Sequence, residues 1–177
     1  MKDIIIVGGG LAGLTAGMYT KRAGLDTILF EKMFTGGQAS TTNLIENYPG
    51  FDDPISGPDF SMKIENHARK FGLEIQYDEI IGMELEGKIK KVITENQEYE
   101  AKAVILAMGA EPKKLGLDKE NEFRGRGVSY CATCDGAFYK DRDVIVVGGG
   151  DTAAEDAMFL AQYASKVYLV HRRDTLR

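Results

Sequence analysis

One short pattern occurs twice in this chain. The segment IIIVGGGLAG at residues 4–13 returns as VIVVGGGDTA at residues 144–153, an offset of 140 residues. In both copies a stretch of helical character follows, and then a second apolar segment, at residues 28–30 and again at 168–170. A β-branched run that enters closely spaced glycines is typical of a buried parallel strand followed by a tight turn and a helix. The repeat therefore predicts two units of the same kind.

The first copy has the full spacing of a dinucleotide-binding turn. Gly8, Gly10 and Gly13 form G-x-G-x-x-G. The first glycine permits the tight turn, the second lets a pyrophosphate approach the backbone, and the third allows close helix packing. The helix expected at residues 11–23 presents its N-terminal amides to the phosphates. Glu31 ends the second strand, where a carboxylate can accept hydrogen bonds from an adenosine ribose. We therefore expect a nucleotide at this copy.

The second copy differs in what ends its second strand. Gly148, Gly150 and Ala153 occupy the three glycine positions, which is the G-x-G-x-x-A variant. Where the first copy has an acid, this copy has a basic cluster, which consists of His171, Arg172, Arg173 and Arg177. A carboxylate would repel a ribose 2′-phosphate, whereas guanidinium groups bind phosphate oxygens in bidentate geometry. The second copy is predicted to prefer NADP(H) to NAD(H), the alternative being a solvated basic patch.

The region between the copies has mixed character. Residues 58–71 carry apolar side chains at helical spacing and predict an amphipathic helix that Gly72 ends. Strand-like pieces at 75–85 and 89–94, and a third from Tyr99 onward, predict a small antiparallel meander. We expect both features to be inserted in the first domain.

A further apolar, β-prone segment lies at residues 103–107 and leads into Gly109. It predicts a strand that returns to the parallel sheet beside the dinucleotide. The polar stretch 113–126 then separates this strand from the second glycine repeat. We therefore place one domain at 1–113 and the other at 114–177.

The two cysteines, Cys131 and Cys134, are spaced C-x-x-C. Two thiols at this spacing, especially at the start of a helix, can form a small-loop disulfide. Asp135 is adjacent and can donate or accept a proton. A zinc site is the alternative, but zinc would need two further ligands, and His67 and His171 do not form a second pair. A reversible redox disulfide is favoured, and we expect no metal ion.

Composition narrows the partners and the location. The 22 Lys and Arg residues against 27 Asp and Glu give a net charge of -5, which argues against nucleic acid and against a membrane surface as partner. No apolar run is long enough for a signal peptide or a membrane span. Two cysteines cannot build a secreted disulfide framework. We therefore expect a cytoplasmic protein.

These features form a single electron path. An FAD-type nucleotide site, an NADPH-type site and a redox dithiol are the parts needed to move an electron pair to an acceptor outside the protein. Hydride from NADPH would reduce the flavin, the flavin would reduce the protein disulfide, and the dithiol would reduce the acceptor.

Together the motifs resemble the low-molecular-weight thioredoxin reductases of bacteria and archaea. The resemblance covers the whole chain through VGGGLAG at 7–13, GGQ at 36–38, ENYPG at 46–50, GRGVSYCATCDG at 125–136, VGGGDTAAEDA at 147–157 and HRRD at 171–174. It implies an α/β fold of two Rossmann-like, three-layer dinucleotide-binding domains. The dithiol would lie in the NADPH-binding domain, and that second domain would be truncated.

The resemblance also implies residue roles. The residues that would contact FAD are Gly8, Gly10, Gly13, Glu31, Gly36, Gly37, Gln38 and Asn47, with Gly109 beside them. NADPH would lie on Gly148, Gly150, Ala153 and His171, with Arg172, Arg173 and Arg177 at its 2′-phosphate. Cys134 would face the flavin, Cys131 would attack the disulfide of thioredoxin, and Asp135 would be the acid–base partner. The family typically forms a homodimer and turns one domain against the other between the two half-reactions.

One departure and three alternatives accompany this resemblance. The family usually has A-T-G-A where this chain has A-M-G-A at residues 107–110, which removes one hydroxyl.

The first alternative is an NADPH-dependent flavin reductase of a peroxiredoxin-reducing disulfide protein, and the second takes electrons from ferredoxin. The third is a flavin-binding fragment without turnover, because only 27 residues follow Gly150 in the 177-residue chain. We expect the chain to be the N-terminal part of a protein of roughly 300 residues.

Overall fold

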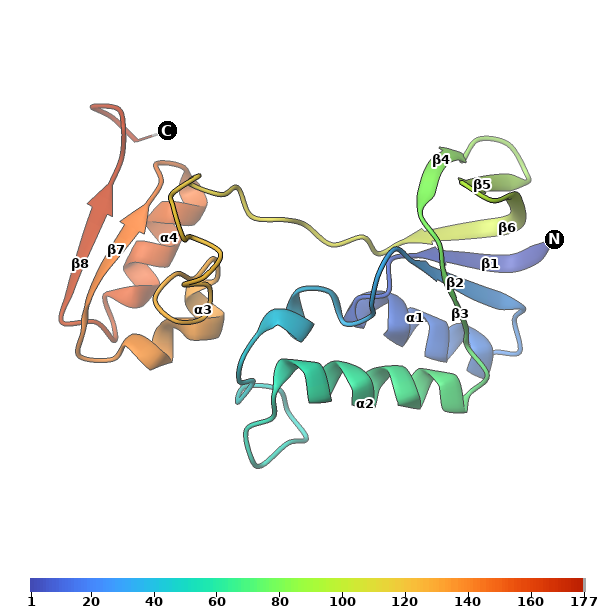
Figure 1. Ribbon diagram of the computed structural model, residues 1–177, viewed down its shortest axis with the longest axis horizontal. Helices are drawn as coiled ribbons and strands as arrows, with labels where there is room; N and C mark the ends of the chain where they lie inside the picture. Colours follow the sequence, from blue (N-terminus) through green and yellow to red (C-terminus); the bar gives the residue numbers. More distant parts are fainter. Residues whose placement is uncertain (177) are drawn as a thin grey trace. The chain divides into compact units, whose positions relative to one another are not determined.

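A computed structural model describes residues 1–176 (Figure 1). The chain divides into two compact units, Met1–Glu111 and Pro112–Arg177, which we call unit 1 and unit 2. The sequence placed the boundary two residues later, after residue 113. No helix within residues 1–176 is both long and apolar enough to cross a membrane.

Unit 1 is built on a six-stranded sheet of order β3-β2-β1-β6-β5-β4. Its central strand, β1 (Lys2–Val7), is paired in parallel with β2 (Thr27–Glu31) on one side and β6 (Glu98–Leu106) on the other. β3 (Glu74–Tyr77) extends the parallel part beyond β2. The parallel sheet expected from the first glycine repeat is confirmed.

Two helices cover one face of this sheet (Figure 1). α1 (Leu11–Arg22) follows β1 directly, and α2 (Gly57–Lys70) follows the short 3-10 helix η1 (Gly37–Thr41) and a loop. α2 begins where the Ser56 hydroxyl accepts a hydrogen bond from the Asp59 amide at 3.1 Å, because this cap satisfies one of the free amides of the first turn. The amphipathic helix predicted at 58–71 is confirmed.

β1 and β2 are apolar at nearly every position because both of their faces are buried. On the helix face, Ile6 and Leu29 pack with residues of α1, α2 and β3. On the other face, Ile5 and Phe30 pack with Val92 of the meander strands. A strand buried on both faces reads as a continuous apolar run, which is why the sequence signal was strong here.

The meander differs from the prediction at both of its ends. The single strand expected at 75–85 is two strands, β3 and β4 (Ile80–Glu84), with Asp78 and Glu79 between them. The Asp78 carboxylate accepts a hydrogen bond from the Asn96 side chain at 3.0 Å, which fixes this corner. β4 then pairs antiparallel with β5 (Lys90–Thr94).

The segments expected from Tyr99 onward and at 103–107 are one strand, β6. Its first half is antiparallel to β5, and the strand is parallel to β1 from Ala101 to Leu106. One strand therefore serves both the meander and the parallel sheet, which a local pattern does not reveal.

Unit 2 repeats the opening of unit 1 and adds the cysteine segment before it. Its elements in chain order are α3 (Ala132–Asp135), η2 (Gly136–Tyr139), β7 (Asp143–Val147), α4 (Asp151–Leu160) and β8 (Lys166–Val170). β7 and β8 are parallel, as β1 and β2 are. Among the described residues, β7 is paired only with β8, and its side chain Ile145 is 67% exposed.

Candidate functional site

The first glycine turn is packed backbone against backbone. Gly8 has φ +104°, and a Cβ there would lie 2.4 Å from the carbonyl oxygen of Ala107. A Cβ on Gly13 would lie 1.9 Å from the carbonyl oxygen of Gly8, so helix α1 can approach the end of β1 only without a side chain at this position. The turn therefore requires glycine at both positions.

Gly10 is different, because the space beside it is open. A Cβ on Gly10 would find its nearest atom, the Cα of Gly37, at 4.0 Å. The backbone of Gly10 is extended, with φ −69°, a conformation that other residues adopt readily. The open space lies at the N-terminus of the 12-residue helix α1. This position fits the approach of a pyrophosphate, which is the role that the motif assigns to it.

Glu31 lies beside this turn. Its Oε2 accepts a hydrogen bond from the Gly9 amide at 2.7 Å, and its Oε1 accepts from the amides of Lys32 and Met33 at 2.8 and 3.2 Å. A carboxylate offers about four acceptor sites, so these three bonds orient the group and leave capacity for a ribose hydroxyl. The side chain is therefore positioned by the backbone before any ligand arrives.

The GGQ segment, residues 36–38, meets the same turn. The Gly36 amide donates to the carbonyl of Gly9 at 2.8 Å, and Gly36 takes φ +104° to do so. The Gln38 side-chain amide donates to the carbonyl of Ala110, next to Gly109. Segments far apart in the sequence thus form one glycine-lined cradle, which we define as residues 8–13, 31, 36–38 and 107–110.

Asn47 is not part of this cradle. It lies exposed on a loop that is closed by paired hydrogen bonds between Ile45 and Ile55, of 2.8 and 2.9 Å. The expected contact of Asn47 with a flavin stays a prediction.

The second glycine turn copies the first in its backbone bonds. The Gly148 amide donates to Val170 at 3.0 Å, as Gly8 donates to Phe30 at 2.9 Å. Of the atoms that the structure describes, none lies within 4 Å of the position of a Cβ on Gly150. A Cβ on Gly148 would lie 2.7 Å from the Cβ of Ala153. In each copy, a side chain at the C-terminal end of the second strand or directly after it lies against the middle glycine of the turn.

In the second copy the covering side chain is His171. A Cβ on Gly149 would lie 2.2 Å from the imidazole ring of His171. The Nε2 atom of this ring is buried and has no hydrogen-bond partner within residues 1–176. A buried polar atom without a partner is costly, so the site fits a ligand that supplies one. Arg172 and Arg173 follow on the exposed surface, and Arg177 lies outside the described residues.

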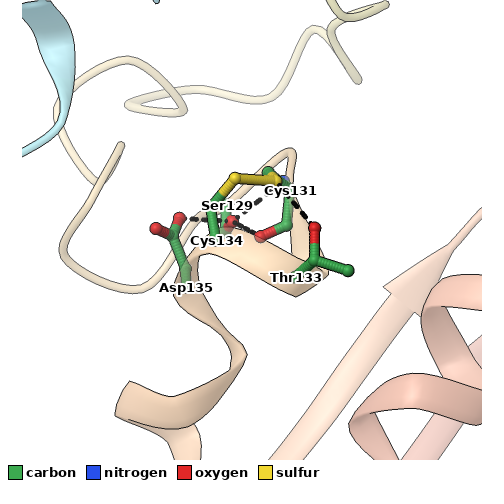
Figure 2. The surroundings of a disulfide bond; sticks show 5 residues. All are labelled: Ser129, Cys131, Thr133, Cys134 and Asp135. Atoms are coloured by element: carbon green, nitrogen blue, oxygen red, sulfur yellow. Dashed lines mark hydrogen bonds between the residues drawn. A yellow bond between two sulfur atoms is a disulfide. The ribbon is translucent and has the colours of Figure 1, made fainter. Parts of the chain in front are cut away.

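The cysteines of unit 2 form a disulfide, Cys131–Cys134, at the start of α3 (Figure 2). Ser129 holds this turn from the preceding loop. Its Oγ accepts a hydrogen bond from the Cys131 amide at 3.1 Å and lies 2.5 Å from Asp135 Oδ2 and 3.2 Å from the Cys131 carbonyl oxygen. The hydroxyl has one proton, so it donates to one of these two acceptors at a time. The C-x-x-C disulfide expected from the sequence is confirmed.

A cavity of about 520 Å³ lies beside the disulfide, between the cysteine segment, β7 and α4. Burial, together with the charge of Asp135, raises the pKa of Tyr139. Burial also raises the pKa of Asp156, which lines the same cavity. Apolar strand residues and acidic side chains thus share this space.

Glu120 fixes the loop that leads to the cysteines. This carboxylate is only 5% exposed and accepts three amide hydrogen bonds, from Leu115, Gly116 and Leu117, at 2.8 to 3.2 Å. The hydroxyl of Tyr130, the residue before Cys131, also donates to it. These hydrogen bonds lower the pKa of Glu120 to about 2. The bond from the Tyr130 hydroxyl contributes most, and the amides add to it.

Sequence reasoning missed both Ser129 and Glu120. Glu120 lies in the charged stretch DKENEF, where nothing distinguishes it from its acidic neighbours. Ser129 lies two residues before the C-x-x-C motif, a spacing that allows a side chain to reach back to the Cys131 amide. That spacing is the one local signal that could have identified it.

Comparison with known proteins finds a matching family and relatives that share sequence identity over nearly the whole chain. Residues 2–177 match the family of pyridine nucleotide-disulphide oxidoreductases. The thioredoxin reductase of Bacillus subtilis is 52% identical over 99% of this chain and 55% of its own length. The chain therefore spans about half the length of the curated relatives it matches.

Two solved structures extend this comparison. The thioredoxin reductase of Streptococcus pyogenes matches with a TM-score of 0.93 at 49% identity, over 100% of this chain and 57% of its own. A ferredoxin-flavin thioredoxin reductase from Clostridium acetobutylicum matches with a TM-score of 0.58 at 37% identity, over 99% and 61%.

Two glycine substitutions should separate folding from binding. Gly13→Ala places a methyl group against the Gly8 carbonyl and should lower the free energy of unfolding by about 1–3 kcal/mol. Gly10→Ala has room for its methyl group and should keep wild-type stability, but the methyl group occupies the space for a pyrophosphate and should abolish FAD binding. Urea unfolding and flavin fluorescence measure the two effects. Equal stabilities, or FAD binding by Gly10→Ala, would contradict this assignment.

Acid should release the Glu120 loop only at very low pH. The pKa of Glu120 in the folded protein lies below the ordinary value of 4.5. The carboxylate therefore contributes its full share to the stability of the loop above pH 4.5, and this contribution is lost as the pH falls towards about 2. Amide exchange at Gly116 and Leu117 between pH 2 and pH 7 measures this loss. Glu120→Gln should raise exchange there at neutral pH about tenfold, whereas Glu122→Gln, at an exposed neighbour, should not. Loss of protection near pH 4.5 would show that Glu120 titrates as an ordinary carboxylate.

Proposed function

Since this chain belongs to the family of pyridine nucleotide-disulphide oxidoreductases, we propose that it carries the two nucleotide sites and the redox disulfide of a thioredoxin reductase. The parent reaction is the NADPH-dependent reduction of the disulfide of thioredoxin. The observation that carries this proposal is the Cys131–Cys134 disulfide, which lies in the same unit as the second glycine turn and has Asp135 held beside it.

The cradle of unit 1 is the proposed FAD site. Gly10 and the GGQ segment leave the backbone open to phosphates, and Glu31 is oriented for a ribose. Unit 2 is the proposed NADPH site, with Gly150 open, a buried His171 nitrogen that has no partner in the described part of the chain, and two exposed arginines for a 2′-phosphate. When bound, the nicotinamide and the flavin supply the electron pair that reduces the disulfide.

The residues of unit 2 then account for the exchange with thioredoxin. In the reduced pair, the Cys131 thiolate attacks one sulfur of the thioredoxin disulfide, that bond breaks, and one thioredoxin thiolate leaves. The Cys134 thiolate next attacks Sγ of Cys131, the mixed disulfide breaks, and the second thioredoxin thiolate leaves. Two electrons pass to thioredoxin, and each leaving thiolate takes up a proton. Asp135, adjacent to the pair, is the proposed donor of one of these protons.

The alternatives differ in donor or acceptor. A structural relative bears the name ferredoxin-flavin thioredoxin reductase, so ferredoxin is the rival electron donor. The basic side chains after β8 favour NADPH, because guanidinium groups bind the oxygens of a ribose 2′-phosphate. A peroxiredoxin-reducing disulfide protein is the rival acceptor, and a flavin-binding fragment without turnover is the rival to activity itself.

Location and assembly belong to the same proposal. We place the protein in the cytoplasm, because its two cysteines form one redox pair and not a secreted framework. A homodimer is proposed on family resemblance, and analytical ultracentrifugation would measure it.

Replacing Cys131 should separate the two half-reactions. Cys131→Ser should abolish NADPH-dependent reduction of thioredoxin, coupled to a disulfide dye, because the attacking sulfur is gone. The same variant should keep the reduction of bound flavin by NADPH, which is followed as bleaching of the flavin absorbance and serves as its internal control.

Other outcomes identify the rivals. If both activities survive the substitution, the dithiol assignment is wrong. Yellow protein without turnover would support the fragment alternative, and colourless protein in the presence of FAD would refute the proposed FAD site. Turnover with reduced ferredoxin but not with NADPH would identify the second alternative.

A further inference from the structure

The two sulfurs of the disulfide have different surroundings. Thr133 lies between the cysteines in sequence, and its Oγ1 is 3.4 Å from Sγ of Cys131 (Figure 2). Within residues 1–176, Sγ of Cys134 has no hydroxyl or amide partner, and Cys134 is exposed. Cys131 is half-buried. The disulfide is therefore asymmetric in its hydrogen bonding.

The direction of the Thr133 contact follows from the chemistry of a disulfide. Neither sulfur carries a hydrogen, so the Thr133 hydroxyl is the donor and Sγ of Cys131 is the acceptor. When the disulfide is reduced and Cys131 becomes a thiolate, the same hydrogen bond acquires a charged acceptor and becomes stronger. The contact thus favours negative charge on one sulfur of the pair.

The backbone that carries this contact is held by hydrogen bonds other than the disulfide bond. The Cys131 amide is held by Ser129 Oγ at 3.1 Å, and the Cys131 carbonyl accepts from the Asp135 amide at 3.1 Å. Both bonds are made by the backbone of Cys131. Thr133 lies two residues further along the same turn, so its hydroxyl stays within reach of this sulfur in the side-chain rotamer that Cys131 has here.

The charged surroundings give the hydroxyl its importance. Nearby cations usually lower the pKa of reactive thiols, but the titratable side chains around the adjacent cavity are acids and tyrosines. They are Tyr130, Asp135, Tyr139, Asp143 and Asp156. The guanidinium of Arg124 lies over the ring of Tyr130, 5.5 Å from its centroid. Carboxylates disfavour a neighbouring thiolate, and a hydrogen-bond donor on the sulfur acts in the opposite direction.

From this arrangement we propose that the Thr133 hydroxyl stabilises the thiolate of Cys131 and makes Cys131, rather than Cys134, the nucleophile of the reduced pair. The inference deepens the proposed function, because it gives a physical cause for the direction of exchange. It is tested without flavin, NADPH or thioredoxin.

The test is the alkylation of the reduced protein by iodoacetamide. The rates of Cys131 and Cys134 are measured separately, by mass spectrometry of their peptides, between pH 5 and pH 10. Thr133→Val removes the hydroxyl at constant shape and should move the midpoint of the Cys131 profile up by about one pH unit. At pH 7 the Cys131 rate should fall about threefold, because a tenfold loss of thiolate is partly offset by its higher intrinsic reactivity.

Three comparisons make the result specific. Cys134 in the same sample is the internal control, and its profile should not move. Thr133→Ser keeps a hydroxyl and should retain the wild-type profile, and Thr133→Ala should behave as Thr133→Val does. An unchanged Cys131 profile in Thr133→Val, or equal shifts at both cysteines, would overturn the proposal. If the proposed function is wrong, the protein will fail to bind flavin or will show no turnover, while the alkylation profiles remain as predicted.

Discussion

The contact between the end of β1 and the first turn of α1 is the constraint on which the rest of unit 1 depends. With no side chain on Gly13, the helix can lie against the Gly8 carbonyl, where a Cβ would be 1.9 Å away. That approach directs the N-terminus of α1 to the open space beside Gly10 and brings Glu31 to the Gly9 amide. The second copy reaches a related geometry at Gly148 and Ala153, with His171 in the place of Glu31.

The sequence predicted those parts of the fold that depend on local spacing. The glycine turns, β1, β2, α2 and the C-x-x-C disulfide all follow from residues close together in the chain. The errors occur where a distant partner decides. β6 is one strand because Ala101 pairs with both Lys2 and Lys90. The strand predicted at 75–85 is interrupted at Asp78, whose carboxylate accepts a hydrogen bond from the distant Asn96. Likewise, the sequence around Glu120 does not indicate that its carboxylate accepts hydrogen bonds from three amides and a tyrosine.

The turn that carries the disulfide is held by two side chains, Ser129 and Glu120. Ser129 fixes the backbone of Cys131 and bonds Asp135, while Glu120 holds Tyr130, the residue immediately before Cys131. The cysteine backbone is thus fixed by side chains that take no direct part in thiol exchange. These hydrogen bonds do not involve the sulfur atoms, so they are available to hold the turn in both redox states of the proposed cycle.

In the proposed function, the electron pair of NADPH reaches the Cys131–Cys134 disulfide. The most direct test is an anaerobic count of thiols after NADPH is added to the protein incubated with FAD and freed of excess flavin. We expect two new thiols per chain, which peptide mapping assigns to Cys131 and Cys134, and none when FAD is omitted. Oxidation of NADPH with bleaching of the flavin but no new thiols would contradict it.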